Sequence, residues 1–173
     1  MVVIKSKKFI LRPFKKGDEK SLQKNINDKE IYRYTLRIPH PYRLKDAKNW
    51  IKQCSKLSKK KNKTSLNFAI DIESEVIGGI GLDAIDNYKA EIGYWLSRRL
   101  WNQSIVTESV RLITNLGFKK LKLKRIYAHV VSKNNSSIRV LKKNGYKLEG
   151  TLKKHHFRDG RFMDIIILAK TKK

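Results

Sequence analysis

The stretch "NNSSIRVLKKNGYKLEG" (Asn134–Gly150) contains a helix and the start of a strand, joined at a single glycine. Asn134 is of a residue type that often caps a helix N-terminus, so a helix is expected over 135–145. Gly145 is expected to end that helix in the left-handed conformation, which a residue without Cβ adopts at little cost. The run "YKLEGTLKKHHF" then predicts a strand over 146–157.

Patterns on either side of this stretch extend the alternation of helices and strands. Pro39 and Pro41 favour a loop over 37–43, and Asp159-Gly160 predicts a tight hairpin turn. The order indicates a mixed α/β fold, and 173 residues most simply form one domain, 1–173. The other predicted elements are strands at 7–14, 65–71, 75–82, 90–96, 125–131 and 161–170, and helices at 18–34 (one or two short ones), 46–61 and 104–118.

Composition limits the cellular locations that are expected for the protein. No run of about 18 apolar residues is present, so no transmembrane helix is expected. The lysine-interrupted N-terminus does not resemble a signal peptide. Cys54 is the one cysteine and cannot form an internal disulfide, which favours a cytoplasmic location. We expect it to be buried on the apolar face of helix 46–61.

The charge is strongly unbalanced, with 41 basic against 15 acidic side chains and a formal net charge of +26. Such a surface attracts polyanions. Two readings stay open, because lysine supplies 30 of the 41 basic residues. The charge either serves a partner such as the ribosome or its RNA, or reflects the residue bias of an A/T-rich genome.

The stretch "GYWLSRRLWNQSIVTES" (Gly93–Ser109) has the pattern strand, turn, helix N-terminus. Free backbone N–H groups and the helix dipole make such a junction an anion site. Glycine usually supplies the close approach, but the turn has none. Asn102 can take the left-handed conformation and Ser104 is expected to cap the helix, while the branched Val106 crowds an approaching phosphate.

Several motifs together resemble one enzyme family. "AEIGYWL", "W..S.VTESV", "N..S.RVLKKNGY.LEG" and "RFMD" follow in the order and spacing typical of the GCN5-related N-acetyltransferases (GNAT), closest to the group of the ribosomal-protein acetyltransferases RimJ and RimL. The resemblance covers nearly the whole chain. It implies a GNAT fold, with a central, mostly antiparallel mixed sheet whose strands splay apart and are flanked by helices. It also implies acetyl-CoA as co-substrate.

The resemblance also implies a set of cofactor contacts. The family's loop is often written "WGKGIATEA", and here both glycines are replaced, by Asn102 and Ser104. The backbone of the strand carrying "GYWL" would pair with the pantetheine arm, and Arg99 would add charge near the loop. Asn134 would contact the cofactor, cap its helix, or do both. The expected cofactor-binding residues are Tyr94, Trp95, Leu96, Arg99, Asn102, Gln103, Ser104, Ile105, Val106 and Asn134.

Acetylation of an amine needs a base for the ammonium and an acid for the departing thiolate. By resemblance, Glu91 or His156 is the base and Ser137 is the acid. Each has a plainer alternative: a sheet-edge carboxylate, a solvated histidine, or a polar residue on a first helical turn. No Cys/His cluster has the spacing of a metal site, so no metal is expected.

The predicted function is therefore transfer of an acetyl group from acetyl-CoA to a primary amine, foremost a protein N-terminal α-amine. Two alternatives stay open. One is a polyamine or aminoglycoside acetyltransferase, although the chain has few carboxylates with which to build an acidic cleft for such cations. The other is a non-catalytic module that binds RNA or protein. The identity of the acceptor also stays open, as does whether the protein forms a homodimer.

Overall fold

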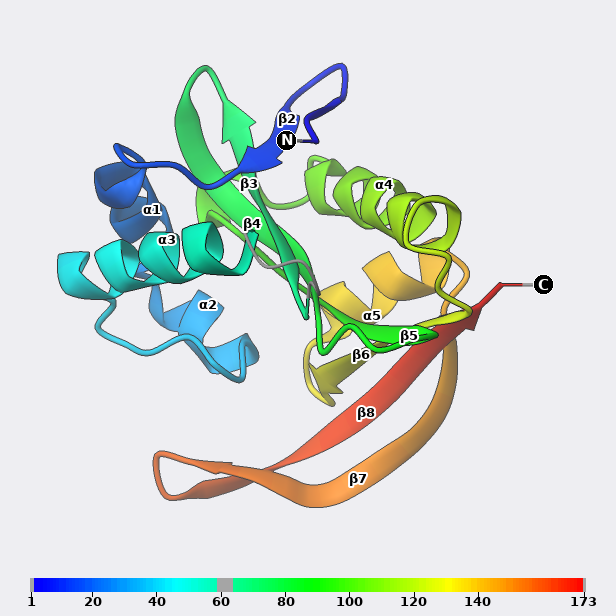
Figure 1. Ribbon diagram of the computed structural model, residues 1–173. Helices are drawn as coiled ribbons and strands as arrows, with labels where there is room; N and C mark the ends of the chain where they lie inside the picture. The colour runs from blue at the N-terminus through cyan, green and yellow to red at the C-terminus, as the bar shows by residue number, and fades with distance from the viewer. Residues whose placement is uncertain (1, 59–63, 173) are drawn as a thin grey trace.

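The chain folds around one mixed sheet, seen here in a computed structural model that describes residues 2–58 and 64–172 (Figure 1). The helices are α1 (Glu19–Ile26), α2 (Lys29–Tyr34), α3 (Leu44–Ser58), α4 (Ile105–Lys119) and α5 (Asn135–Lys143), with a short 3-10 turn, η1 (Arg98–Leu100). The strands are β1 (Ile4–Lys5), β2 (Ile10–Pro13), β3 (Leu66–Ile72), β4 (Glu75–Asp83), β5 (Lys89–Leu96), β6 (Arg125–Val131), β7 (Lys147–Arg158) and β8 (Arg161–Thr171).

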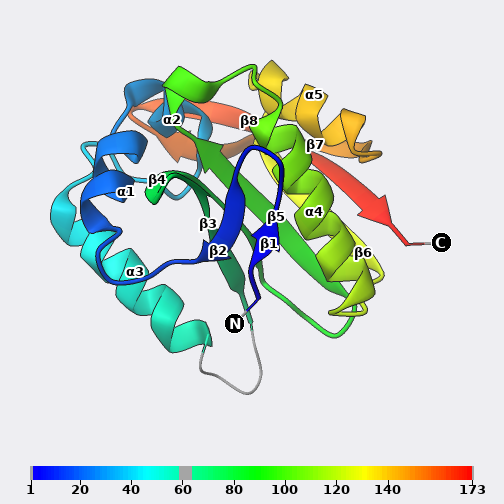
Figure 2. The same cartoon turned by 90° about the horizontal axis from the view of Figure 1, so that it is seen from above.

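Eight strands form this sheet in the order β1-β2-β3-β4-β5-β6-β8-β7. Every pair is antiparallel except β5 with β6, which run parallel. Helices α1, α2 and α3 cover one face, and α4 and α5 cover the other (Figure 2). The expected mixed α/β class and GNAT-type sheet are thus confirmed.

The sheet opens in its middle, between β5 and β6. These strands pair only where Lys89, Ala90 and Glu91 lie beside residues 125–127. Beyond Glu91, β5 runs on to Leu96 and β6 to Val131 with no further pairing between them. The backbone edge of residues 92–96 therefore faces a gap where any guest needs matching donors and acceptors.

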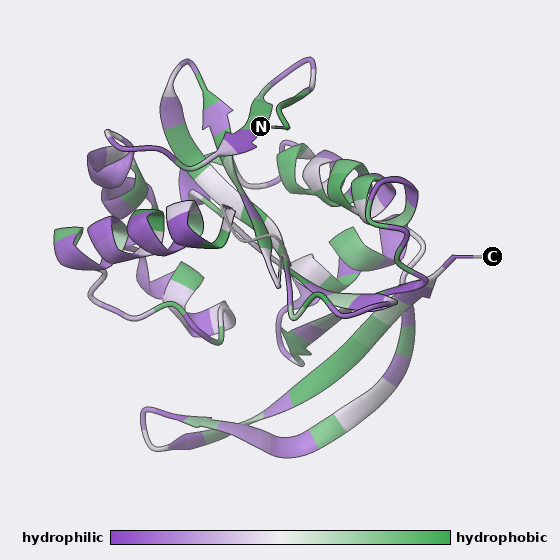
Figure 3. Cartoon of the chain, viewed as in Figure 1, coloured by the Kyte–Doolittle hydropathy of each residue, from purple (hydrophilic) through white to green (hydrophobic). Residues whose placement is uncertain are grey.

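Hydrophobic residues recur along the strands, while α1 and much of α3 are hydrophilic (Figure 3). Two clusters of buried apolar side chains form the core. The larger cluster packs β2 to β6 and β8 against α4 and α5. The smaller one packs α1, α2 and α3 onto β3 and β4, and it includes Cys54. The predicted burial of Cys54 is confirmed, and burial raises the pKa of its thiol to about 12.

Local signals in the sequence are confirmed at both ends of α5. The side chain of Asn134 accepts a hydrogen bond from the Ser137 N–H, which makes it the N-cap. At the other end Gly145 has φ +80°, and the N–H groups of Gly145 and Tyr146 donate to the carbonyls of Lys142 and Leu141. This is the pattern of a Schellman cap, which satisfies carbonyls that the helix leaves free.

Differences from the prediction are confined to short elements and ends. The two-residue β1 and the single turn η1 were not predicted, because neither is long enough to show a periodicity. Helix α3 covers Leu44–Ser58, and positions 59–61 of the predicted helix lie outside the described residues.

The β7–β8 hairpin forms one edge of the sheet and curves away from the other strands, so that its tip lies beside α2 (Figure 1). Asp159 and Gly160 form its turn at φ 51° and 72°, as predicted. Both carboxylate oxygens of Asp159 accept from the Tyr32 hydroxyl, at 3.0 and 2.9 Å. Arg158 stacks on the Tyr32 ring at 4.0 Å and donates to the carbonyl of Thr35 at 2.6 Å. The hairpin tip is thereby fastened to the helical layer on that face.

Candidate active site

A first cavity of about 470 Å³ lies at the N-terminus of α4. Its lining combines the turn at 100–104, the first turn of α4 and residues along the length of α5. Eight of the predicted cofactor residues line it: Tyr94, Leu96, Asn102, Gln103, Ser104, Ile105, Val106 and Asn134.

The turn takes up a glycine-like backbone without glycine. Asn102 has φ 64° and Ser104 has φ 62°, both in the left-handed region. These are the two positions at which the GNAT loop pattern has glycine. An L-residue pays about 1–2 kcal/mol there, and asparagine tolerates it better than most. The turn therefore has, at both positions, the positive φ that glycine adopts most readily.

The free backbone N–H groups of this turn form a site suited to an anion. Among residues 2–58 and 64–172, no N–H of residues 102–107 donates a hydrogen bond to another part of the chain. Ser104 occupies the N-cap position of α4, as expected, but its side chain makes no capping hydrogen bond, and its carbonyl accepts from the Glu108 N–H. The first turn of α4 thus keeps its positive dipole end and its free donors for a phosphate. Val106 is half-buried beside it.

Three basic side chains line the first cavity, Arg139 and Lys143 on α5 and Lys133 just before it. Arg99, predicted to contact the cofactor, does not line it. The 3-10 turn η1 directs its guanidinium to Glu75, with Nη2 2.7 Å from Oε2. The cationic wall of this cavity therefore comes from α5 rather than from the "SRR" segment.

A second cavity of about 440 Å³ lies on the other side of the gap in the sheet. Its walls come from α1, α3, the loop 35–39, β4, β5 and β6. Trp95 lines this second cavity and not the first. The two cavities meet, because they share Tyr34, Thr35, Tyr94, Asn134 and Ser137.

Ser137 lies at this junction and is held by its neighbours on both sides. Its N–H donates to Asn134 Oδ1 at 3.1 Å, and its carbonyl accepts from the Tyr94 hydroxyl at 3.3 Å. Burial raises the pKa of Tyr94. Tyr94 was expected to contribute only its backbone, and its hydroxyl was missed because it reaches across to α5, a contact that sequence spacing does not indicate.

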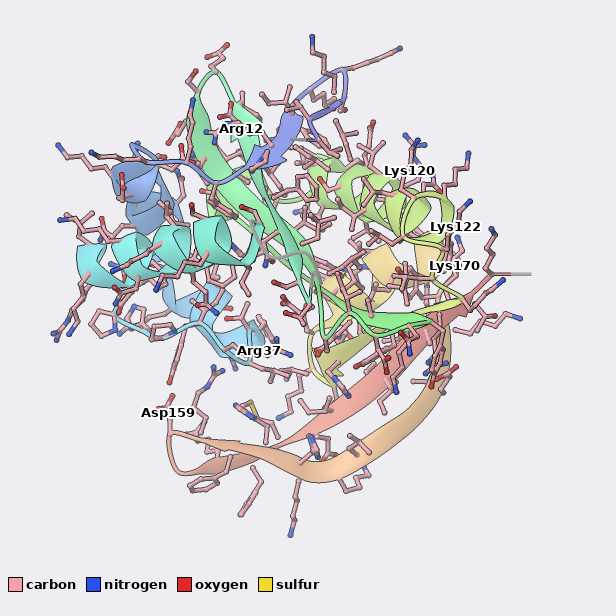
Figure 4. All side chains as sticks on the ribbon, viewed as in Figure 1. Arg12, Arg37, Lys120, Lys122, Asp159 and Lys170 are labelled. Carbon is pink, nitrogen blue, oxygen red and sulfur yellow. The ribbon has the colours of Figure 1, made fainter. Side chains whose placement is uncertain are left out.

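A chain of charged groups runs along the edge of the second cavity. Glu91 is 15% exposed and accepts from Arg37 at 2.6 Å, and its other oxygen lies 3.2 Å from His129 Nδ1. Arg37 also lies 3.5 Å from Asp83, whose pKa is raised by burial and lowered in part by Arg37. Figure 4 shows Arg37 reaching across from the loop beside α2. Glu91 thus has a histidine partner inside the cavity.

His156, the other predicted base, lines neither cavity. Strand β7 has a bulge between Leu152 and His156, with Lys154 at φ 50°, which disturbs the regular alternation of its side chains. It is His155 whose ring stacks with that of His129, at 6.4 Å. His129 was not among the residues predicted for the site. Its place on the first strand beyond the gap is the signal that could have identified it.

The expected shortage of carboxylates is also wrong for this cavity. Asp46, Asp83 and Glu91 all line it, against one arginine, Arg37. A chain of formal charge +26 thus concentrates negative charge at this cavity. A cationic amine is attracted to such a wall.

Two further properties concern the described residues only. They contain no group of three or more His, Cys, Asp or Glu side chains that could hold a metal ion. None of their helices has the length and apolar content needed to cross a membrane.

Comparison with known proteins agrees with this geometry. Residues 8–147 match the family model described as an acetyltransferase (GNAT) domain. The chain is 29% identical to an uncharacterized N-acetyltransferase, p20, of Bacillus licheniformis, covering all of this chain and 98% of the relative. It is 25% identical to the L-amino acid N-acetyltransferase AaaT of Escherichia coli, over 94% and 98% of the two chains. A ribosomal-protein-serine acetyltransferase of Escherichia coli is 31% identical over 60% of this chain and 59% of its own.

Solved structures share the fold. RimL, a ribosomal-protein α-N-acetyltransferase in complex with coenzyme A, superposes with a TM-score of 0.89 at 20% identity, over 98% of both chains. A microcin self-immunity acetyltransferase in complex with acetyl-CoA and AMP superposes with a TM-score of 0.83 at 22% identity, over 96% of this chain and 94% of that one.

Proposed function

This chain belongs to the acetyltransferase (GNAT) family and is an acetyl-CoA-dependent N-acetyltransferase, and we propose that its acceptor is the α-amine at the start of a protein chain. The observation that carries the proposal is the meeting of two cavities at the gap between β5 and β6. One offers free N–H groups and cations, and the other offers carboxylates and an apolar wall. A ribosomal-protein-serine acetyltransferase among the relatives supports a protein acceptor.

Acetyl-CoA would lie in the first cavity. Its pyrophosphate would accept from the N–H groups of residues 102–107, with Arg139 and Lys143 balancing the charge. The backbone edge of residues 94–96 that faces the gap, unpaired on the β6 side, would bond the pantetheine arm and lead the thioester into the gap. Acetyl-CoA supplies the activated acetyl group, and the fold supplies its position.

The amine would attack the thioester directly once it has lost a proton. We assign that proton to Glu91, directly or through a water, with His129 holding or sharing the charge. The new N–C bond forms as the C–S bond breaks, and the nitrogen then releases its second proton to water. The Ser137 hydroxyl at the junction would give a proton to the departing thiolate and take one back from water. Holding both reactants in the gap supplies much of the rate through proximity.

The basic surface would then serve docking. Lys120, Lys122 and Lys170 lie together at the end of the molecule where α4 ends and β8 finishes (Figure 4). We propose that this surface attracts ribosomal RNA in the cytoplasm, bringing the acceptor chain to the enzyme. Co-sedimentation with ribosomes should fall steeply as salt rises, and a Lys120→Glu/Lys122→Glu pair should weaken it.

An acetylation assay tests the acceptor class. We expect peptides with a free N-terminus to be acetylated at the α-amine, and the same peptides with a blocked N-terminus and an internal lysine to stay unmodified. Mass spectrometry of the products distinguishes the two sites. Modification of lysine side chains alone would overturn the proposal.

A small-amine acetyltransferase stays the second candidate. Asp46, Asp83 and Glu91 in the second cavity favour a cationic acceptor of any size, and one relative is an L-amino acid N-acetyltransferase. Spermidine, an aminoglycoside and free amino acids belong in the same assay. Turnover of these with none of the peptides would establish this candidate instead.

A further inference from the structure

The middle of strand β5 has a residue without a side chain, Gly93, where the strand faces the second cavity. Gly93 lies in a central strand between the buried Ile92 and the half-buried Tyr94, yet it is exposed. A Cβ built on Gly93 would meet no atom within 4 Å. Its side of the strand therefore opens directly into the second cavity, which Gly93 lines.

Two more glycines lie on the same face of the neighbouring strand β4, and side chains cover both of them. Gly79 pairs with Trp95, and Gly81 pairs with Gly93, so all of them share one face. A Cβ on Gly79 would lie 2.5 Å from Trp95 Nε1, and a Cβ on Gly81 would collide with Asn67 Oδ1. The open floor of the hollow is therefore Gly93, bordered by the side chains of Trp95 and Asn67.

The hollow is roofed by apolar and aromatic side chains. Trp50 of α3 lies edge-on to Phe14, with ring centroids 6.1 Å apart. The lining on this side is Phe14, Leu22, Ile26, Tyr42, Trp50 and Trp95. None of these residues belongs to the catalytic cluster, and a hollow of this composition is built to desolvate an apolar group.

The charged residues at the edge of the second cavity determine where the amine end of the acceptor lies. Glu91 lies two residues before Gly93 on the same face of β5, so an amine held at Glu91 places its substituent over Gly93. Arg37 is the one lysine or arginine among the described residues lining this cavity, and it already faces both Asp83 and Glu91. A carboxylate next to the amine would meet three carboxylates and no free cation. The site therefore disfavours a free amino acid and favours a chain or an amide.

We propose that the acceptor is a chain whose first residue has a large apolar side chain, leucine, methionine or phenylalanine, seated in the hollow over Gly93 beside the indole of Trp95. The inference rests on the proposed function and adds to it the specificity of the same site. One extra methylene in such a pocket gives roughly 10–200-fold discrimination at most, and loss of a whole side chain lies at the upper end.

The test measures kcat/KM for peptides that differ only in the first residue: Gly, Ala, Ser, Leu, Met and Phe. Leucine and phenylalanine peptides are expected to exceed glycine and alanine peptides by about 10-fold or more. Leucinamide is expected to exceed leucine by about 10-fold, because it lacks the repelled carboxylate. Trp50→Ala should reduce the preference for the large side chain, and Trp50→Phe should keep most of it. Tyr88→Ala is the matched control, since Tyr88 is 49% exposed and lines neither cavity.

The wild-type panel decides the question even if a tryptophan variant folds poorly. Equal turnover of all the peptides, or a preference for Gly, Ala or Ser, would overturn the inference and leave the proposed function standing. Turnover of spermidine or free amino acids with none of the peptides would overturn both. A preference for large apolar first residues that Trp50→Ala removes and Tyr88→Ala keeps would establish it.

Discussion

The two cavities of this protein are built in different ways. The first depends on a short local segment, the turn at 101–104 with the start of α4, and it works through backbone N–H groups. The second draws on side chains from α1, α3, the 35–39 loop and three strands. Backbone geometry tolerates a change of side chain, as Asn102 and Ser104 show. A pocket made of side chains does not, so the cofactor end should be robust and the acceptor end selective.

The largest expected effect lies at the acceptor end. Glu91→Gln removes the proposed base while keeping the size of the side chain, so kcat should fall by about 10²–10⁴-fold. Acetyl-CoA affinity should stay within about two-fold, because the cofactor end uses backbone groups. Steady-state kinetics and calorimetric titration check the two halves separately. Glu73→Gln, at an exposed turn residue, is the control. An unchanged kcat would remove Glu91 from the mechanism.

Acetyl-CoA binding should weaken strongly only when a substitution disturbs the backbone of the turn at 101–104. Ser104→Val puts a β-branched residue at φ 62°, a conformation such residues avoid, at a cost of about 1–3 kcal/mol. Acetyl-CoA binding should weaken by about 5–100-fold, since 1.4 kcal/mol is ten-fold in affinity. Ser104→Asn, which tolerates the left-handed region, is the matched comparison. Equal loss in both variants would mean that the serine side chain itself binds the cofactor.

Replacing the two left-handed residues of the turn with glycine tests the same backbone strain by relieving it. Ser104→Gly should relieve about 1 kcal/mol of strain, which is worth about 2–4 °C in Tm for a chain of this size. Asn102→Gly should gain less, because asparagine already tolerates positive φ. Thermal unfolding measures both. A loss of stability in Ser104→Gly would show that the turn is not strained.

The smallest effect concerns Cys54, behind the acceptor cavity. Burial raises the pKa of its thiol to about 12, so the reactive thiolate stays scarce until the pH approaches that value. At pH 8 the folded protein should react with a thiol reagent far more slowly than the denatured protein. Absorbance during labelling measures the two rates. Rapid labelling of the folded chain would show that the helical layer around α3 opens readily.

The same contrast explains what could be predicted from the sequence. The Asn134 cap, the Gly145 end of α5 and the Asp159 turn were predicted because each depends on neighbours in the chain. The left-handed path of Asn102 was foreseen for the same reason. His129 and the direction of Arg99 were not, because each depends on a partner far along the chain, Glu91 or Glu75. A bulge in β7, which the residue pattern does not show, precedes His156, and His155 is the histidine that stacks with His129.

The central claim is that a turn without glycine still forms a working acetyl-CoA site. Calorimetric titration of acetyl-CoA into the purified protein, at low and at moderate salt, tests it most directly. The salt comparison is needed because a chain of formal charge +26 attracts any polyphosphate. We predict micromolar binding that survives added salt and weakens in Ser104→Val. Binding that disappears as salt rises, equally in both proteins, would contradict the account.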